Sequence, residues 1–142
     1  MNRSYLHFRH WLLGALLFCA VNSQAQLAVT VSPPKIVGQK IVVKLAMKNN
    51  LADKVESARA VVFLLDDQGK MVGQSTKWVI GGTKDRPPLA PKGETTFNFV
   101  ITSPQPFTTT NLTAKVSFDR MVLSSNTAAD VNKNVQTQDA PK

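Results

Sequence analysis

The sequence predicts an all-β protein, an antiparallel β-sandwich of about six or seven strands, and three observations favour this fold class. Apolar and polar residues alternate over much of the chain, which is the period of strands that bury one face and expose the other. Gly, Pro, Asn and Asp gather between the alternating runs, as they do in turns and loops. No stretch combines a helical period with capping residues, and only residues 49–59 could form a short helical turn.

The first half of the chain contains three of the predicted strands. Residues 27–31 (LAVTV) and 40–48 (KIVVKLAMK) alternate, and lysines occupy the polar side of the second run. Residues 58–65 (ARAVVFLL) are apolar at both parities, which favours a central strand covered on both faces.

The second half continues the pattern and contains two long loops. Further strands are predicted at residues 74–80 (QSTKWVI), 96–101 (TFNFVI) and 112–119 (LTAKVSFD). Residues 81–93 (GGTKDRPPLAPKG) and 102–111 (TSPQPFTTTN) are the connecting loops. Short strands separated by turn signals at fairly regular spacing indicate an immunoglobulin-like sandwich, here without a disulfide.

Residues 1–25 have the features of a cleavable signal peptide. Basic residues without an acid precede an apolar run at residues 11–21, and small residues follow at Ser23 and Ala25. We predict cleavage after Ala25, a periplasmic or secreted location, and no transmembrane span in the mature chain. An uncleaved membrane anchor is the alternative.

Cleavage would limit the catalytic and metal-binding groups that the mature chain can form. The removed residues include the only cysteine, both histidines and the only tyrosine, namely Cys19, His7, His10 and Tyr5. A mature chain without them cannot form a Ser–His–Asp or Cys–His catalytic group, and zinc and copper sites usually need these side chains. We therefore predict a non-enzymatic protein without a cofactor or metal. An enzyme that uses only Ser, Lys, Asp or Glu stays open as an alternative.

The chain divides into three predicted segments. After the signal peptide, residues 26–123 are expected to form the sandwich domain. Residues 124–142 are polar and nearly free of large apolar side chains, so they are predicted to form a disordered tail.

Four motifs in order carry a family resemblance: an alternating strand that ends in asparagines, an apolar strand that ends in Asp with Gly soon after, a Leu–Pro–Gly–Glu-like turn, and an aromatic alternating strand. They are VKLAMKNN (43–50), VVFLLDDQGKMVG (61–73), LAPKGETTFNF (89–99) and LTAKVSF (112–118). In this order they resemble the FxLYD-type domain and related immunoglobulin-like modules of exported bacterial proteins. The namesake tyrosine is absent, and Lys92 is inserted in the Pro–Gly turn. The resemblance implies an extracytoplasmic accessory module and brings no catalytic residues.

Asp66 and Asp67 stand side by side after an apolar run, with Gly69 close behind. A calcium loop would need further oxygen ligands at alternating positions and a later Glu, and position 70 is a lysine. Two carboxylates acting on one substrate would have to face each other, whereas adjacent strand residues point to opposite faces. We interpret the three residues as a structural turn.

Lys40, Lys44 and Lys48 have even spacing, so a strand would place all three on one face. They could contact a polyanionic glycan or lipid headgroups, or they could be a solvated face or guard an exposed sheet edge. Nucleic acid is not the expected partner, because no exposed aromatic residues are interleaved with the lysines for base stacking.

The loop of residues 81–93 is the first expected contact surface for a partner protein. It is long, its prolines make it stiff, and it contains Lys84, Arg86, Leu89 and Lys92. Phe107 in the next loop is the second. A plain crossover between the two sheets is the alternative. Taken together, the sequence predicts an adaptor or accessory subunit of a bacterial envelope or surface assembly, which binds its partner by strand addition or through this loop.

Overall fold

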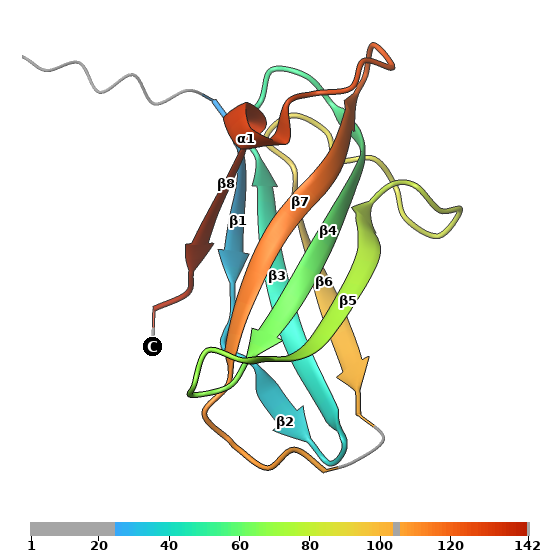
Figure 1. Cartoon of the computed structure of the whole chain (residues 1–142). Helices are drawn as coiled ribbons and strands as arrows, with labels where there is room; N and C mark the ends of the chain where they lie inside the picture. Colours follow the sequence, from blue (N-terminus) through green and yellow to red (C-terminus); the bar gives the residue numbers. More distant parts are fainter. Residues whose placement is uncertain (1–24, 104–105, 142) are drawn as a thin grey trace, which may run out of the picture.

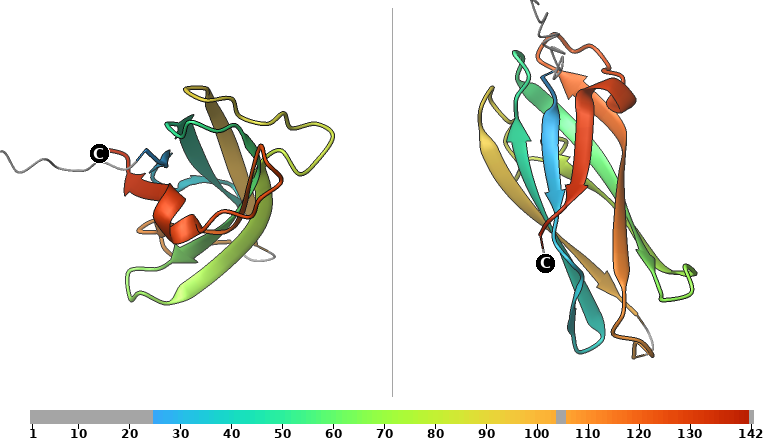
Figure 2. Two further views of the ribbon diagram at one scale, coloured as in Figure 1. Left: turned by 90° about the horizontal axis from the view of Figure 1, so that it is seen from above. Right: turned by 90° about the vertical axis from the view of Figure 1, so that its left-hand side faces the viewer.

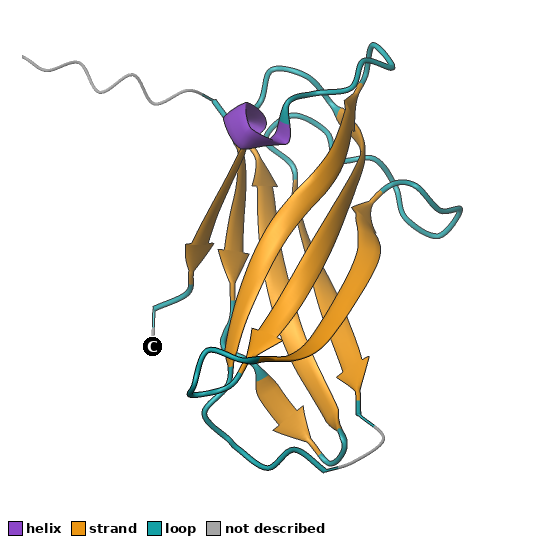
Figure 3. Cartoon of the chain, viewed as in Figure 1, coloured by secondary structure: helices purple, strands orange, loops and turns teal. Residues whose placement is uncertain are grey.

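The computed structural model describes residues 25–103 and 106–141, and it confirms the predicted fold class. Two β-sheets pack face to face, and one short helix lies near the C-terminus (Figures 1 and 3). The predicted signal peptide lies almost entirely outside the described residues. The strands are β1 (Leu27–Val31), β2 (Lys35–Val37), β3 (Lys40–Asn49), β4 (Val55–Leu65), β5 (Met71–Ile80), β6 (Glu94–Thr102), β7 (Thr113–Leu123) and β8 (Val135–Asp139), and the helix is α1 (Val131–Asn134).

The larger sheet is built around β3. Strand β6 pairs antiparallel along one side of β3, from Lys40 opposite Thr102 to Lys48 opposite Glu94. Strands β1 and β2 share the other side, one at each end of β3. Strand β8 extends this sheet beyond β1 and runs parallel to it.

The smaller sheet has the order β5–β4–β7, and both pairings are antiparallel. Strand β4 is therefore central, as its apolar sequence indicates. A β-bulge interrupts the β4–β5 pairing at Ala58 and Arg59, and another interrupts the β4–β7 pairing at Arg59 and Ala60. Bulges of this kind strengthen the local twist, which is visible in the curvature of β4 and β5 in Figure 1.

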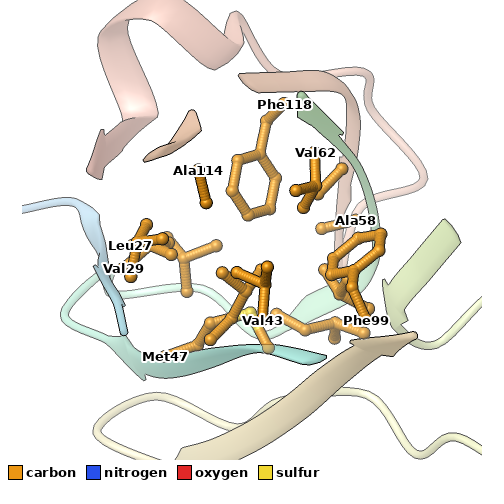
Figure 4. Close-up of a cluster of buried hydrophobic side chains, with 14 of the residues drawn as sticks. Leu27, Val29, Val43, Met47, Ala58, Val62, Phe99, Ala114 and Phe118 are labelled. Atoms are coloured by element: carbon orange, nitrogen blue, oxygen red, sulfur yellow. The ribbon is translucent and has the colours of Figure 1, made fainter. Parts of the chain in front are cut away.

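The core lies between the sheets and contains the alternate residues that the sequence pattern assigns to one face. Figure 4 shows Val43 and Met47 of β3 facing Ala58 and Val62 of β4, with Phe118 closing the cluster from β7. All five are almost fully buried. Burial of one face of each sheet is what imposes the two-residue period on these strands.

One expectation about β4 is wrong. We expected both of its faces to be covered, but Val61, Phe63 and Leu65 are only half-buried on the outer face. No layer of the described chain packs over that face. The outer-face residues of β4 lie beside side chains of β5 and β7 alone, as Phe63 lies opposite Gln74 and Lys115.

The C-terminal segment also differs from expectation, because residues 131–139 are ordered. Asp130 caps α1 by accepting a 3.0 Å hydrogen bond from the Asn132 amide, and β8 then pairs with β1 over its whole length. Val131 and Val135 pack against the core. Backbone pairing orders the segment, although four of the five residues of β8 have exposed side chains. The folded domain thus extends beyond residue 123.

Residues 49–59 form no helical turn. Residues 51–53 form a bend, and β4 begins at Val55. Within the described part of the chain, no helix has the length and apolar character needed to cross a membrane.

Candidate functional site

The Asp66–Gly69 segment has the geometry of a tight turn between β4 and β5. The Asp66 carboxylate accepts hydrogen bonds from the backbone amides of Gln68, at 2.9 Å, and Lys70, at 2.8 Å. Gly69 adopts a φ of +76°, which few other residues tolerate. Asp67 is exposed, and no cluster of three His, Cys, Asp or Glu suited to a metal ion occurs among residues 25–103 and 106–141. Asp66 therefore holds the turn through its carboxylate, whereas the Asp67 side chain makes no hydrogen bond to it in the described chain.

Leu89 is buried and cannot serve as a partner contact, which corrects our expectation. It is 7 % exposed and exchanges two 2.9 Å backbone hydrogen bonds with Val55. The flanking prolines made the residue look like part of an exposed loop, but this bridge ties the middle of the loop to the start of β4.

Arg86 is half-buried and holds the same loop from the other side. Its guanidinium donates a hydrogen bond to the Trp78 carbonyl oxygen and lies 4.4 Å from the centre of the Phe97 ring. Lys84 and Lys92 remain exposed, and Phe107 is half-buried against the core. The loop of residues 81–93 is thus held against β4, β5 and β6, and its exposed residues are mainly lysines and prolines.

The lysine stripe lies on the outer face of the larger sheet, as the even spacing predicts. Lys40, Lys44 and Lys48 are all exposed. Strand β3 has partners on both sides, so these lysines do not guard a sheet edge. Lys48 differs from the other two because its ammonium lies 3.7 Å from the Glu94 carboxylate.

A surface ion pair joins β4 to β7 on the outer face of the smaller sheet. Arg59 donates three hydrogen bonds of 2.8–3.1 Å to both Asp119 carboxylate oxygens. These bonds lower the pKa of Asp119 and raise the pKa of Arg59. Arg59 also lies 5.6 Å from the centre of the Trp78 ring, so this pair and the tryptophan brace the sheet around the bulges.

Strands β7 and β8 lie side by side along one side of the sandwich (Figure 2). A groove that sequence reasoning missed runs between them. Its central hollow, of about 290 Å³, continues into two smaller hollows of about 150 and 180 Å³. Val31 and Ala114 line both the central hollow and one neighbour, and Val116 and Thr137 line both the central hollow and the other. We call this feature the β7–β8 groove.

Both strands that border the groove have an edge without a partner strand, although Met121 and Leu123 at one end of β7 already bond to the backbone of Ala129 and Thr127. Strand β7 is the last strand of its sheet and β8 is the last strand of the other, and in the described chain neither pairs with a strand across the groove. The lining is mixed. Ala114 and Val116 from β7 and Val31 from β1 form an apolar strip, Thr113, Thr137 and Gln138 are polar, and Lys115 and Asp139 contribute charge. Sequence reasoning could not find this site, because its two sides come from segments about 20 residues apart, of which one looked disordered.

Comparisons with known proteins identify no relative: no family model, curated protein or solved structure matches the chain.

Proposed function

We propose that this protein is an exported, non-enzymatic interaction module of a bacterial envelope or surface assembly, and that it binds a partner protein by accepting an extended segment at the edge of β7. The observation that carries the proposal is the edge of β7 over residues 113–119, which has no partner strand in the described chain and lies beside a groove with an apolar strip. Strand addition at such an edge is a recurring mode of peptide recognition.

The groove fits an extended segment better than a compact ligand. It follows the length of β8, and an added strand would satisfy backbone groups that β7 presents on its free side. Because strand side chains alternate, every second residue of the segment would face the apolar strip of Val31, Ala114 and Val116. The preferred segment therefore has small or β-branched apolar residues at alternate positions.

The second expected mode, contact through the loop of residues 81–93, has less support. Leu89 and Arg86 are engaged within the fold, so the loop exposes mainly lysines and prolines. Export and the accessory role rest on the signal-peptide features and on the resemblance of residues 40–122 to exported modules.

The test is affinity capture from the native envelope after crosslinking, with wild type and two matched variants. Thr137→Arg places a long charged side chain in the groove at an exposed position of β8, and Thr76→Arg makes the same change on β5. We expect Thr137→Arg to lose the captured partner by tenfold or more, on the order of the cost of burying an unpaired charge, and Thr76→Arg to retain it.

Val116→Arg serves as a second groove variant if Thr137→Arg does not fold. Equal capture by the groove variants and by Thr76→Arg would contradict the proposal. Recovery of nothing but the protein itself in all samples would also contradict it.

A further inference from the structure

One end of the outer face of the larger sheet combines three lysines with three valines. Lys40 lies between Val37 of β2 and Thr102 of β6, and Val42 lies between Lys35 and Val100. Residues directly opposite each other on neighbouring strands are about 5 Å apart at Cβ, so the six side chains form one continuous surface. We call it the lysine–valine face, and its residues are Lys35, Val37, Lys40, Val42, Lys44 and Val100.

The lysines of this face have no acidic partner. Residues 35–44 and 96–102 contain no Asp or Glu, and no ion pair involves Lys35, Lys40 or Lys44 in the described residues. Lys48, further along β3, is paired with Glu94 and is therefore left out of the face. The positive potential of the three remaining lysines is free to act on an external anion.

The valines narrow the class of anion. Val37 is 55 % exposed and Val100 is 50 % exposed, so both present apolar surface to solvent beside the lysines. A highly hydrated polyanionic glycan would contact the lysines and gain little from the valines. A phospholipid surface offers headgroup charge to the lysines and an apolar boundary to the valines.

We propose that the lysine–valine face docks on an anionic phospholipid surface. The docking orients the sandwich with the larger sheet toward the lipid and leaves the β7–β8 groove free for a partner. This inference does not depend on the proposed function, because the two surfaces involve different residues and are tested with different ligands.

The experiment measures cosedimentation of the folded protein with vesicles of phosphatidylglycerol and phosphatidylcholine, and with vesicles of phosphatidylcholine alone. We expect binding to the anionic vesicles only, and a steep loss of binding as the salt concentration rises. Lys40→Glu/Lys44→Glu should weaken binding by about 30-fold or more, from the contribution of each lysine near an anionic surface. Lys77→Glu/Lys84→Glu is the matched control, with the same charge change at exposed positions outside the face.

A second pair of variants separates lipid from glycan. Val37→Ser/Val100→Ser keeps every charge and should weaken vesicle binding roughly fivefold, because less apolar surface meets the lipid. Dextran sulfate is the polyanion control, and the valine variants should leave any binding to it unchanged.

Three outcomes would overturn the inference. The first is an equal loss of vesicle binding in the control pair. The second is vesicle binding that the valine substitutions leave unchanged. The third is binding to dextran sulfate without binding to anionic vesicles. The salt titration of wild type needs no variant, so the inference stays testable if a variant fails to fold.

Discussion

At the scale of single residues, the fold depends on a few side chains that form hydrogen bonds with the backbone of loops, and Asn49 is the clearest example. It is the only fully buried polar side chain in the described chain. Its amide group donates to the carbonyl oxygens of Asp53 and Leu89 at 2.9 and 3.0 Å, and its carbonyl oxygen accepts from the Leu51 amide at 3.0 Å. Asn49 thus joins the β3–β4 loop to the loop of residues 81–93.

Replacing Asn49 with Ala should lower the free energy of unfolding by about 3 kcal/mol, because three hydrogen bonds to backbone groups are lost, one of them buried and two part-buried. Urea denaturation measures the change. Asn50→Ala is the control, since Asn50 is exposed and its hydrogen bond to the Gln26 carbonyl oxygen uses the backbone amide. Similar losses in the two variants would show that the Asn49 side chain has no special role.

Two glycines with left-handed backbone differ in what surrounds them. Gly69 has open space around its missing side chain, whereas a methyl group at Gly81 would overlap the Glu56 carbonyl oxygen. We expect Gly69→Ala to cost about 1 kcal/mol and Gly81→Ala about 3 kcal/mol or more. Thermal and urea unfolding measure both, and equal costs would contradict the close approach of the chain at Gly81.

At the scale of elements, the strands with alternating sequence could be predicted and the segments held by backbone bonds could not. In β3, Ile41, Val43 and Leu45 are buried as their spacing indicates, because packing of one face leaves a period in the side chains. Strand β8 is held to β1 by backbone hydrogen bonds. These bonds do not require alternating apolar side chains, and residues 135–139 (VQTQD) show no such alternation. The same reason hides the Val55–Leu89 bridge, where a strand-like contact lies within a proline-rich loop.

Hydrogen exchange tests the order of β8. The amides of Gln136 to Asp139 that bond to β1 should exchange more slowly than those of unstructured peptides, yet faster than the amides of the central strand β3. Exchange at the unprotected rate throughout residues 135–139 would contradict the order of β8 and would mean that this segment is disordered, as its composition predicts.

The Arg59–Asp119 pair should give stability that depends on pH. Its hydrogen bonds lower the pKa of Asp119 in the folded state, so its contribution is present above the unfolded pKa of about 3.9. The contribution is lost as pH falls through the folded pKa. Asp119→Asn should be slightly less stable than wild type near pH 7, because the pair is partly exposed, and the difference should vanish at low pH.

Urea denaturation from about pH 7 down to about pH 2 measures this difference. Asp67→Asn is the control, since Asp67 is exposed and makes no ion pair among the described residues. A difference between wild type and Asp119→Asn that grows as the pH falls would contradict the assigned ion pair.

At the scale of the whole molecule, the core holds the two sheets together, and no strand pairing joins them along the side between β7 and β8 in the described chain. The β7–β8 groove and the lysine–valine face lie on different surfaces, so one molecule could hold a partner strand and a lipid surface together. The position of Lys40 and Lys44 could be predicted from the sequence, because residues at even spacing in a strand lie on the same face. The groove could not be predicted, since it exists only where β8 pairs with β1 instead of with β7.

The central claim is that an extended segment of a partner binds along β7, and site-specific photo-crosslinking in the native envelope tests it most directly. A photoreactive amino acid at Thr137 lies in the groove, and the same residue at Thr76 on β5 is the matched control. We predict that Thr137 yields a crosslink to one partner peptide with apolar residues at alternate positions, and that Thr76 does not. Crosslinks of equal yield at both positions, or none at Thr137, would contradict the account.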